Sequence, residues 1–334
     1  MRARGKIIIF VFLFLVLFNV IYFFIKYKKS DNNSQRINTE AVEVKEELHP
    51  LMIETLRARR YESQTIKIEK YLGDKGKYKN YLVSYYSDEL KLFALLSIPD
   101  DSTRVKFPVV IVNHGYIPPS KYSTENSYKL VSGYFASNGF LVLKPDYRGH
   151  DKSEGNYDSV LTRLSYPVDV LNLLVSISSI KEADADNIFV YGHSMGGGIT
   201  LTLLEVSDKI KAATLWAAVS NGYPENTLYF TRKRSTDEGA ELFSRIKEVF
   251  EEKDFPKLSP NKYLQYIKAP VLIQHGMQDE SVPYQWSLDL VEKFKEFGIN
   301  YKFYSYENED HNFSKKYFYT VLQRDVDFFK SYIK

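Results

Sequence analysis

The sequence feature that most constrains the fold is a serine between an apolar run and a helix-like segment, in residues 187–198 (NIFVYGHSMGGG). The pattern G-x-S-x-G around Ser194 places a glycine on each side, where a strand has to turn tightly into a helix. Such a turn presents the serine hydroxyl at the carboxyl edge of a sheet, where it can act as a nucleophile. A structural glycine-rich turn is the alternative. The position of the motif between a strand and a helix favours the nucleophile.

Two further residues provide the base and the acid that a serine hydroxyl requires. Asp279 follows the apolar run 271–274, and His311 follows the predicted strand 301–306. Both therefore lie where loops at the carboxyl edge of the sheet begin, and the chain order is serine, acid, histidine. We expect His311 to be the general base and Asp279 to orient its ring.

Other ionisable side chains close to these two residues have alternative interpretations. Glu280 is a second candidate for the acid, whereas Glu309 and Asp310 are expected to be solvated loop charges or minor orienting groups. His114 and His275 each precede a glycine at a strand end, and histidines in such positions usually hold loop backbone by hydrogen bonds. We expect that structural role for both.

Hydrolysis of an ester or amide also needs two donors for the oxyanion of the tetrahedral intermediate. The N–H of Met195, directly after the serine, is the first expected donor. The second is expected in the loop after the apolar run 108–113, where Gly115 permits a turn without a side-chain clash. We choose the N–H of Tyr116. The predicted oxyanion hole therefore consists of Met195 and Tyr116.

Apolar strand-like runs alternate with longer amphipathic segments from residue 61 to the C-terminus. Three early runs are expected to be antiparallel, and six later runs are continuously apolar, as in parallel strands covered on both faces. The repeated strand-then-helix order predicts an α/β fold, an open and mostly parallel sheet with helices on both faces. The nine runs are 65–72, 81–87, 90–98, 108–113, 140–145, 188–191, 212–219, 271–274 and 301–306.

Amphipathic segments between these runs predict the helices. Pro167 has to lie near the start of its helix or kink it. Residues 221–266 interrupt the alternation with a charged, largely helical insertion, which we interpret as a small cap over the carboxyl edge of the sheet. The predicted helices are 127–138, 161–180, 195–206, 285–297 and 312–333.

Residues 1–29 are predicted to form a transmembrane signal-anchor. The run 7–25 is apolar except for Asn19, and at about 1.5 Å per residue it is long enough to span a bilayer. A cleaved signal peptide is the alternative, but no small-x-small cleavage site follows the run. Residues 30–60 are expected to be a linker or stalk, and residues 61–334 the catalytic domain. We expect a single-pass membrane protein whose catalytic domain is extracytoplasmic.

Composition excludes several classes of function. The chain has no cysteine, which excludes thiolate catalysis, cysteine-ligated zinc and a lipid-modified cysteine as the membrane attachment. Its net charge is only +3, and its lysine and arginine residues are dispersed. Nucleic acid is therefore not an expected partner.

With these residues placed, the chain resembles the serine hydrolases of the α/β-hydrolase superfamily, nearest the prolyl oligopeptidase-like (S9) and dienelactone hydrolase-like groups. The resemblance implies an eight-stranded, mostly parallel sheet and no metal or organic cofactor. It also implies a catalytic triad of Ser194, Asp279 and His311. The motifs that carry it are 113–115 (NHG), 145–150 (PDYRGH), 192–197 (GHSMGG) and 275–283 (HGxxDxxVP).

The chain departs from the large S9 peptidases, which place a β-propeller before the hydrolase domain. Here only residues 30–60 separate the predicted anchor from the predicted domain. We therefore expect a carboxylesterase or deacylase that acts on a small ester. The alternatives are an S9-like serine peptidase that acts on short peptides, an acyltransferase, and a catalytically silent, membrane-tethered binding module. A complete triad argues against the last of these.

Overall fold

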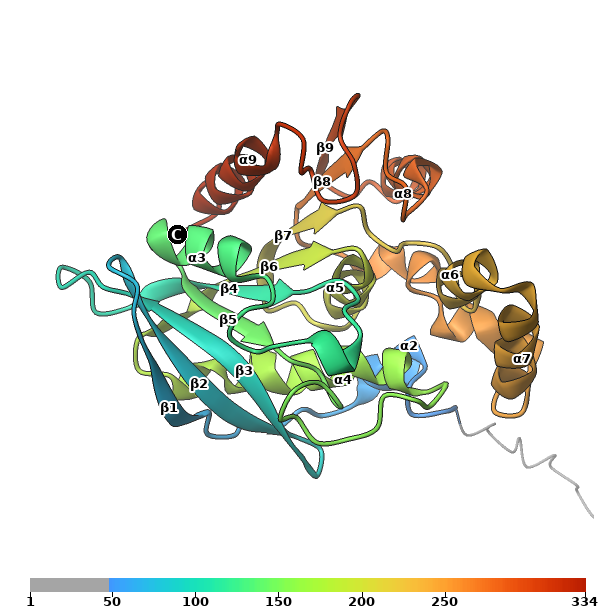
Figure 1. Cartoon of the computed structure of the whole chain (residues 1–334), viewed down its shortest axis with the longest axis horizontal. Helices are drawn as coiled ribbons and strands as arrows, with labels where there is room; N and C mark the ends of the chain where they lie inside the picture. Colours follow the sequence, from blue (N-terminus) through green and yellow to red (C-terminus); the bar gives the residue numbers. More distant parts are fainter. Residues whose placement is uncertain (1–47) are drawn as a thin grey trace, which may run out of the picture. The chain divides into compact units, whose positions relative to one another are not determined.

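The predicted apolar runs form the strands of one nine-stranded sheet in the computed structural model, which describes residues 48–334 (Figure 1). The predicted membrane anchor and most of the linker lie outside the described residues. Within residues 48–334, no helix combines the length and the apolar character that crossing a membrane requires.

The sheet is antiparallel at one edge and parallel over the rest of its width. Its spatial order is β1-β2-β3-β5-β4-β6-β7-β8-β9. The pairs β1–β2, β2–β3 and β3–β5 are antiparallel, and all later neighbours are parallel. The strands are β1 Lys67–Asp74, β2 Tyr78–Ser87, β3 Leu90–Pro99, β4 Phe107–Asn113, β5 Leu141–Pro145, β6 Ala183–His193, β7 Ile210–Trp216, β8 Val271–Gly276 and β9 Tyr301–Tyr306.

The mostly parallel α/β-hydrolase sheet is confirmed, but the implied number of eight strands is wrong. The strand beyond eight is β1, which pairs only with β2 and lies at the antiparallel edge. Most of its residues are exposed or half-buried, and its register with β2 shifts twice. An edge strand of this kind needs only one partner strand and no covering helix layer. A ninth strand can therefore extend the sheet without changing its core.

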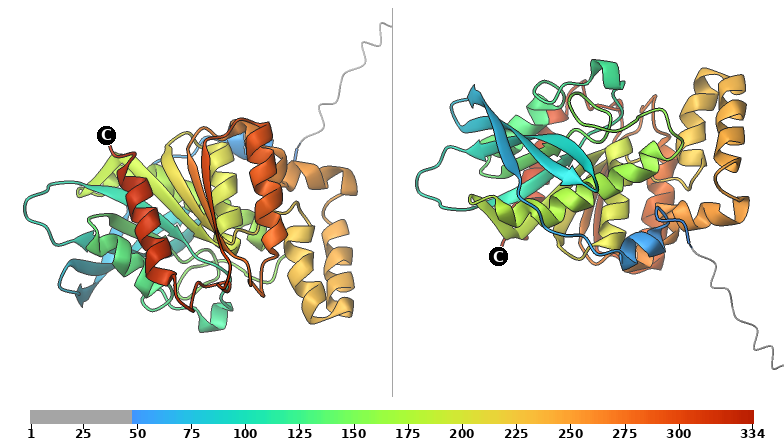
Figure 2. Two further views of the ribbon diagram at one scale, coloured as in Figure 1. Left: turned by 90° about the horizontal axis from the view of Figure 1, so that it is seen from above. Right: turned by 90° about the horizontal axis from the view of Figure 1, so that it is seen from below.

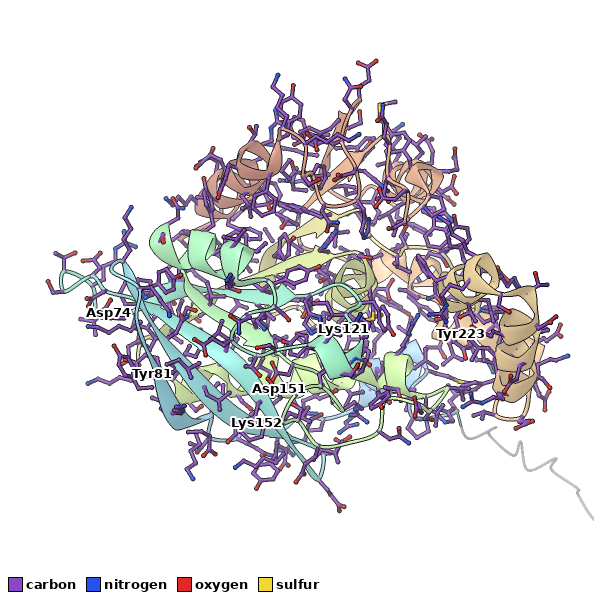
Figure 3. All side chains as sticks on the ribbon, viewed as in Figure 1. Asp74, Tyr81, Lys121, Asp151, Lys152 and Tyr223 are labelled. Carbon is purple, nitrogen blue, oxygen red and sulfur yellow. The ribbon has the colours of Figure 1, made fainter. Side chains whose placement is uncertain are left out.

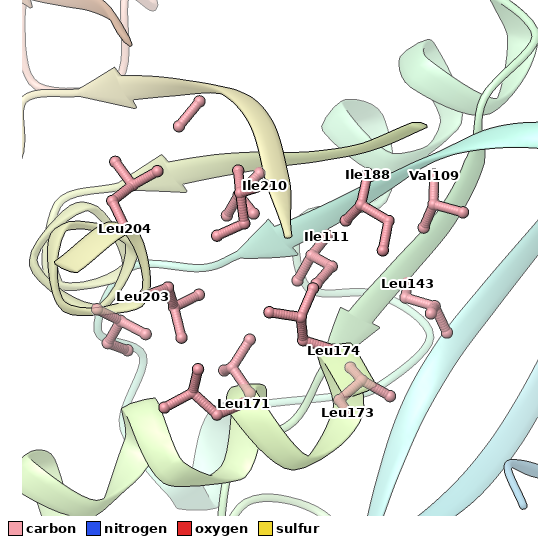
Figure 4. Close-up of a cluster of buried hydrophobic side chains, with 14 of the residues drawn as sticks. Val109, Ile111, Leu143, Leu171, Leu173, Leu174, Ile188, Leu203, Leu204 and Ile210 are labelled. Atoms are coloured by element: carbon pink, nitrogen blue, oxygen red, sulfur yellow. The ribbon is translucent and has the colours of Figure 1, made fainter. Parts of the chain in front are cut away.

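The core lies on both faces of the sheet, because successive side chains of a strand point to opposite faces. Every residue of β4 is buried. Val109 and Ile111 pack with apolar side chains of α4 and α5 on one face (Figure 4). Apolar side chains of α8 belong to the same cluster. Val110 and Val112 pack with those of α3 and α9 on the other face. The continuous apolar run 108–113 therefore reflects burial on both faces.

Helices cover the two faces of the sheet, as the views in Figure 2 show. In the described part of the chain they are α2 Ile53–Ala58, α3 Lys129–Ser137, α4 Thr162–Ser176, α5 Met195–Val206, α6 Glu225–Arg234, α7 Thr236–Lys247, α8 Tyr284–Glu296 and α9 Phe318–Lys330. The bounds predicted for α5 are those observed. Pro167 lies inside α4 without ending it, although the proline ring cannot donate to the carbonyl group of Arg163.

The start of α9 differs from the prediction, since this helix begins at Phe318 and not at residue 312. The buried carboxylate of Glu309 accepts hydrogen bonds from the backbone N–H groups of Lys315, Lys316 and Tyr317, at 3.2, 2.7 and 2.9 Å. Phe313 has a φ of +53°, which a right-handed helix does not allow. Glu309 is thus a structural group of this loop, and the prediction that it is a solvated charge is wrong.

The segment between β7 and β8, residues 221–266, contains α6, α7 and three short 3₁₀ helices. We call it the β7–β8 segment. Its apolar side chains, including Tyr223 (labelled in Figure 3), form a cluster that also contains Met52 and is packed by Leu161 and Leu164. The 3₁₀ helices are Glu252–Leu258, Pro260–Lys262 and Leu264–Tyr266.

We expect Glu309→Ala to lower the free energy of unfolding by about 2–3 kcal/mol, because it leaves three backbone donors of the loop without their buried acceptor. Urea denaturation measures the loss. Glu307→Ala is the matched control, since Glu307 is exposed and should change stability by less than about 0.5 kcal/mol. Equal stability of the two variants would contradict the role assigned to Glu309.

Candidate active site

The order of the strands places a crevice at the carboxyl ends of β4 and β6. These two strands are neighbours in the sheet, while β5 lies on the other side of β4. The chain therefore continues from β4 to one side of the sheet and from β6 to the other side. Open α/β sheets bind ligands at such a point. The loop after β4 and the turn after β6 meet here.

Ser194 lies in the turn between β6 and α5, in the position that the motif predicted. Its φ is +56° and its ψ is −119°, a conformation that costs a non-glycine residue on the order of 1–3 kcal/mol. The surrounding backbone holds it there. The N–H of Ser194 donates to the carbonyl of Trp216 at 2.8 Å, and its own carbonyl accepts from the N–H of Val219 at 3.0 Å. The turn is therefore fixed by the end of β7 and the residues that follow it.

The two glycines of the motif are required by close contacts. A Cβ atom on Gly196 would lie 2.0 Å from the carbonyl oxygen of Asn113, at the end of β4. A Cβ on Gly192 would lie 2.3 Å from Oγ1 of Thr200 in α5. Both distances are far inside van der Waals contact. Glycine at position 196 lets the turn after β6 pack directly against the end of β4, and glycine at position 192 leaves room for α5.

Asp279 and His311 are joined by a hydrogen bond, in which Nδ1 of His311 donates to Oδ2 of Asp279 at 2.7 Å. The other carboxylate oxygen of Asp279 accepts from the N–H groups of Ser281 and Val282, at 2.7 and 2.8 Å. The side chain of Asp279 is fully buried, whereas that of Glu280 is exposed. Of the two candidate acids, the structure therefore pairs Asp279 with the histidine ring.

His275 also contacts this carboxylate, which the sequence did not predict. Its Nε2 lies 3.0 Å from Oδ2 of Asp279 and 3.3 Å from the carbonyl oxygen of Val282. Burial alone would raise the pKa of Asp279. The hydrogen bonds from His275 and His311 outweigh burial and hold the pKa of Asp279 below its usual value. The carboxylate therefore stays ionised at any pH near neutrality.

A chain of hydrogen bonds connects the loop after β4, the serine turn and the loop of His311. The N–H of Gly115 donates to the hydroxyl of Tyr128 at 2.9 Å, and this hydroxyl donates to Nδ1 of His193. Nε2 of His193 lies 3.0 Å from the carbonyl oxygen of His311. Because a carbonyl only accepts, Nε2 of His193 carries the proton and Nδ1 is the acceptor.

His193 is buried and stays neutral. Burial, and then the nearby ring of His311, lower the pKa of His193 to about 3. His193 occupies a variable position of the G-x-S-x-G pattern, and the sequence does not single out Tyr128. Neither residue carries a local sequence signal, since their contact joins the start of α3 to the end of β6.

Ser194 and His311 line one pocket of about 820 Å³, together with Met195 and Tyr116. This volume is typical of a small-molecule site. Within residues 48–334, no hydrogen bond joins the Ser194 hydroxyl to His311. Such a bond is often formed only when substrate is bound. The apolar part of the lining comes from α2, α4, α5 and the β7–β8 segment: Leu56, Leu164, Pro167, Ile199, Tyr223 and Leu258.

The N–H groups of Met195 and Tyr116 have no acceptor within the described residues, although both residues line the pocket. The neighbouring N–H of Gly115 donates a hydrogen bond to the hydroxyl of Tyr128. A Cβ on Gly115 would lie 3.2 Å from the Cβ of Ser194, so this loop passes directly beside the serine. Two unpaired backbone donors therefore come from the two segments that were predicted to supply them.

Comparisons with known proteins agree with this fold. Residues 126–334 match the model of the prolyl oligopeptidase family, which is more than half of the chain. The peptidase YtmA of Bacillus subtilis is 30% identical over 191 residues, which are 54% of this chain and 68% of that protein. The acylamino-acid-releasing enzyme of Mus musculus is 24% identical over 259 residues, or 69% of this chain but only 32% of that enzyme.

Solved structures of both esterases and peptidases share the fold. Acetyl xylan esterase 1 from Thermoanaerobacterium superposes with a TM-score of 0.60 at 16% identity, over 82% of this chain and 90% of that one. Dipeptidyl peptidase 4 of Porphyromonas gingivalis gives a TM-score of 0.56 at 21% identity, over 84% of this chain and 37% of that one. Identities this low show the fold alone. From the family match, this α/β-hydrolase chain belongs to the prolyl oligopeptidase family and is a hydrolase of the serine type.

Proposed function

We propose that the chain hydrolyses carboxylic esters or amides through a triad of Ser194, His311 and Asp279 and a covalent acyl-enzyme. The observation that carries the proposal is the strained Ser194, which shares a pocket with a histidine whose ring is bound to a buried, ionised carboxylate. An activated serine hydrolase needs a nucleophile, a base and a group that orients the base.

The reaction follows from the position of each group. Nε2 of His311 accepts the proton of Ser194 Oγ while this oxygen attacks the carbonyl carbon of the substrate. Nδ1–H of His311 stays bound to Asp279, which stabilises the positive ring. The oxyanion accepts hydrogen bonds from the N–H groups of Met195 and Tyr116. When the carbonyl re-forms, the bond to the leaving group breaks and His311 protonates that group.

Water then completes the turnover. It enters after the first product has left, and Nε2 of His311 takes one of its protons while the oxygen attacks the acyl carbon. The second tetrahedral intermediate uses the same two N–H donors. Its collapse releases the acid and returns the proton from His311 to Ser194 Oγ, so that the enzyme ends unchanged.

The preferred substrate class is a small ester, which makes the chain a carboxylesterase or deacylase. The pocket is lined largely by apolar side chains and has a volume suited to a small-molecule substrate. A serine peptidase that acts on short peptides is the second candidate, because the Bacillus subtilis relative at 30% identity is named a peptidase.

We expect 4-nitrophenyl esters of short carboxylic acids to be hydrolysed faster than the 4-nitroanilides of the same acids, since an amide is the weaker electrophile. Release of 4-nitrophenol and 4-nitroaniline measures the two rates. Steady hydrolysis of aminoacyl amides without hydrolysis of acyl esters would favour the peptidase instead.

Labelling by a fluorophosphonate probe tests the proposed triad. We expect Ser194→Ala to abolish labelling, and His311→Ala and Asp279→Asn to slow it by a factor on the order of 10³–10⁴. Ser120→Ala is the matched control, because Ser120 is an exposed serine outside the pocket and should label as wild type does. Labelling that persists in Ser194→Ala would overturn the assignment of the nucleophile.

Tyr128→Phe tests the hydrogen-bond chain behind the site. The change leaves the N–H of Gly115 and Nδ1 of His193 without a partner, so the loop of Tyr116 is no longer held. Loss of one such buried bond costs about 1–3 kcal/mol, and we expect kcat/KM to fall roughly 5- to 100-fold on a 4-nitrophenyl ester.

Tyr134→Phe is the control for this variant. Its hydroxyl bonds only to the exposed side chain of Gln323, and the substitution should leave kcat/KM within about twofold of wild type. A Tyr128→Phe enzyme as active as the control would show that the chain does not position the site.

A further inference from the structure

The charged side chains that line the reaction pocket are mostly cationic. Arg163 comes from the first turn of α4, and Lys233 and Arg234 come from the last turn of α6. Among residues 48–334, the only carboxylate in the lining is Glu280. Such a distribution gives the pocket a positive potential, which attracts anions.

Arg163 lines the pocket without an acidic partner among residues 48–334. Its side chain is half-buried, and within residues 48–334 it forms neither a salt bridge nor a hydrogen bond. Burial, together with nearby Arg234, lowers the pKa of Arg163. By contrast, the guanidinium of Arg148 is paired with the buried carboxylate of Asp169 at 2.6 Å. A poorly solvated guanidinium without a counter-ion is costly unless a ligand supplies one.

The other two cations of the pocket are only weakly neutralised. Nζ of Lys233 donates to the backbone carbonyl of Glu280. Because this acceptor is neutral, the bond does not compensate the charge of Lys233. Arg234 pairs with Glu238 at 3.6 Å, but both side chains are about two-thirds exposed, and such pairs contribute little. Both residues therefore add to the positive field around Arg163.

The position of Arg163 relative to Ser194 determines where an anionic group would lie. Gly115 is in van der Waals range of Ser194, and the next residue, Tyr116, carries the guanidinium of Arg163 over its ring at 5.2 Å from the ring centre. One residue of the loop after β4 thus links the segment beside the nucleophile to the unpaired cation, and Ser194 and Arg163 line the same pocket. A substrate whose reactive carbonyl is at Ser194 can present a second group to Arg163 within that pocket.

We propose that the substrate carries a carboxylate close to its scissile bond and that Arg163 binds this carboxylate. The proposal rests on the proposed function, because it names the substrate class of the same site. The planar guanidinium offers two parallel N–H donors that match a carboxylate. The substrate is then a half-ester of a short dicarboxylic acid, with the charge on the acyl side, or an ester whose leaving group is a hydroxy acid.

Two matched pairs of esters, assayed with the full chain, distinguish these two cases. Mono-4-nitrophenyl glutarate and 4-nitrophenyl pentanoate test a carboxylate on the acyl side. The pair 3-acetoxybenzoate and 3-acetoxybenzamide tests a carboxylate on the leaving side. We expect a preference in one of the two pairs, the pair whose carboxylate lies on the side that Arg163 binds. In that pair, kcat/KM for the charged ester should exceed that for the neutral ester by about tenfold or more.

Variants of Arg163 test its role in this preference. Arg163→Met keeps the length of the side chain and should reduce the ratio of charged to neutral kcat/KM roughly 10- to 100-fold. Arg163→Lys keeps the charge without the planar fork and should retain part of the preference. Arg60→Met is the control, because Arg60 is exposed, pairs with Glu62 and lies outside the pocket. It should leave both rates unchanged.

The outcomes separate this inference from the proposed function. Hydrolysis of the neutral esters without a preference for either charged ester would overturn the inference and leave the serine hydrolase in place. An equal loss on charged and neutral esters in Arg163→Met would also overturn it, since Arg163 would then act only by packing on Tyr116. No hydrolysis of any of the four esters and no fluorophosphonate labelling would overturn both.

Discussion

The contact between the turn after β6 and the end of β4 is the constraint on which the rest of the site depends. Gly196 packs so tightly against the carbonyl of Asn113 that no other residue fits there. This contact places Gly115 beside Ser194 and directs the N–H groups of two different segments to one pocket. The strained backbone of Ser194 is tolerated because β7 and the residues after it hold the turn.

Most of the fold could be predicted because each strand is a local apolar run. The nine runs correspond to the nine strands, whereas the number of strands implied by the family resemblance was wrong. The start of α9 could not be predicted, because it depends on Glu309. Its carboxylate binds three N–H groups across a loop, and Glu309 lies among polar residues that give no sign of burial. The pattern of apolar and polar residues that predicts a helix carries no information about such an interaction.

The candidate site was likewise only partly predictable from the sequence. Chain order and strand ends pointed to Asp279 and His311, and a hydrogen bond joins these two side chains. His275, Tyr128 and Arg163 were missed as site residues. Tyr128 matters through a partner distant in the chain, and Arg163 through the lack of an acidic partner within residues 48–334, whereas His275 contacts the nearby Asp279. The motif HGxxDxxVP did contain a signal for His275, because its histidine lies at the end of β8 and its aspartate in the loop that follows.

The central claim is that Ser194 carries the acyl group during turnover. Acid quenching of the enzyme during hydrolysis of a slowly deacylating ester, followed by trypsin digestion and mass spectrometry, tests it most directly. Ser194 lies in the tryptic peptide 182–209, which is bounded by Lys181 and Lys209. We predict that this peptide gains the mass of the acyl group and that fragmentation places it on Ser194. Turnover without an adduct on this peptide, or with the acyl group on another residue, would contradict the account.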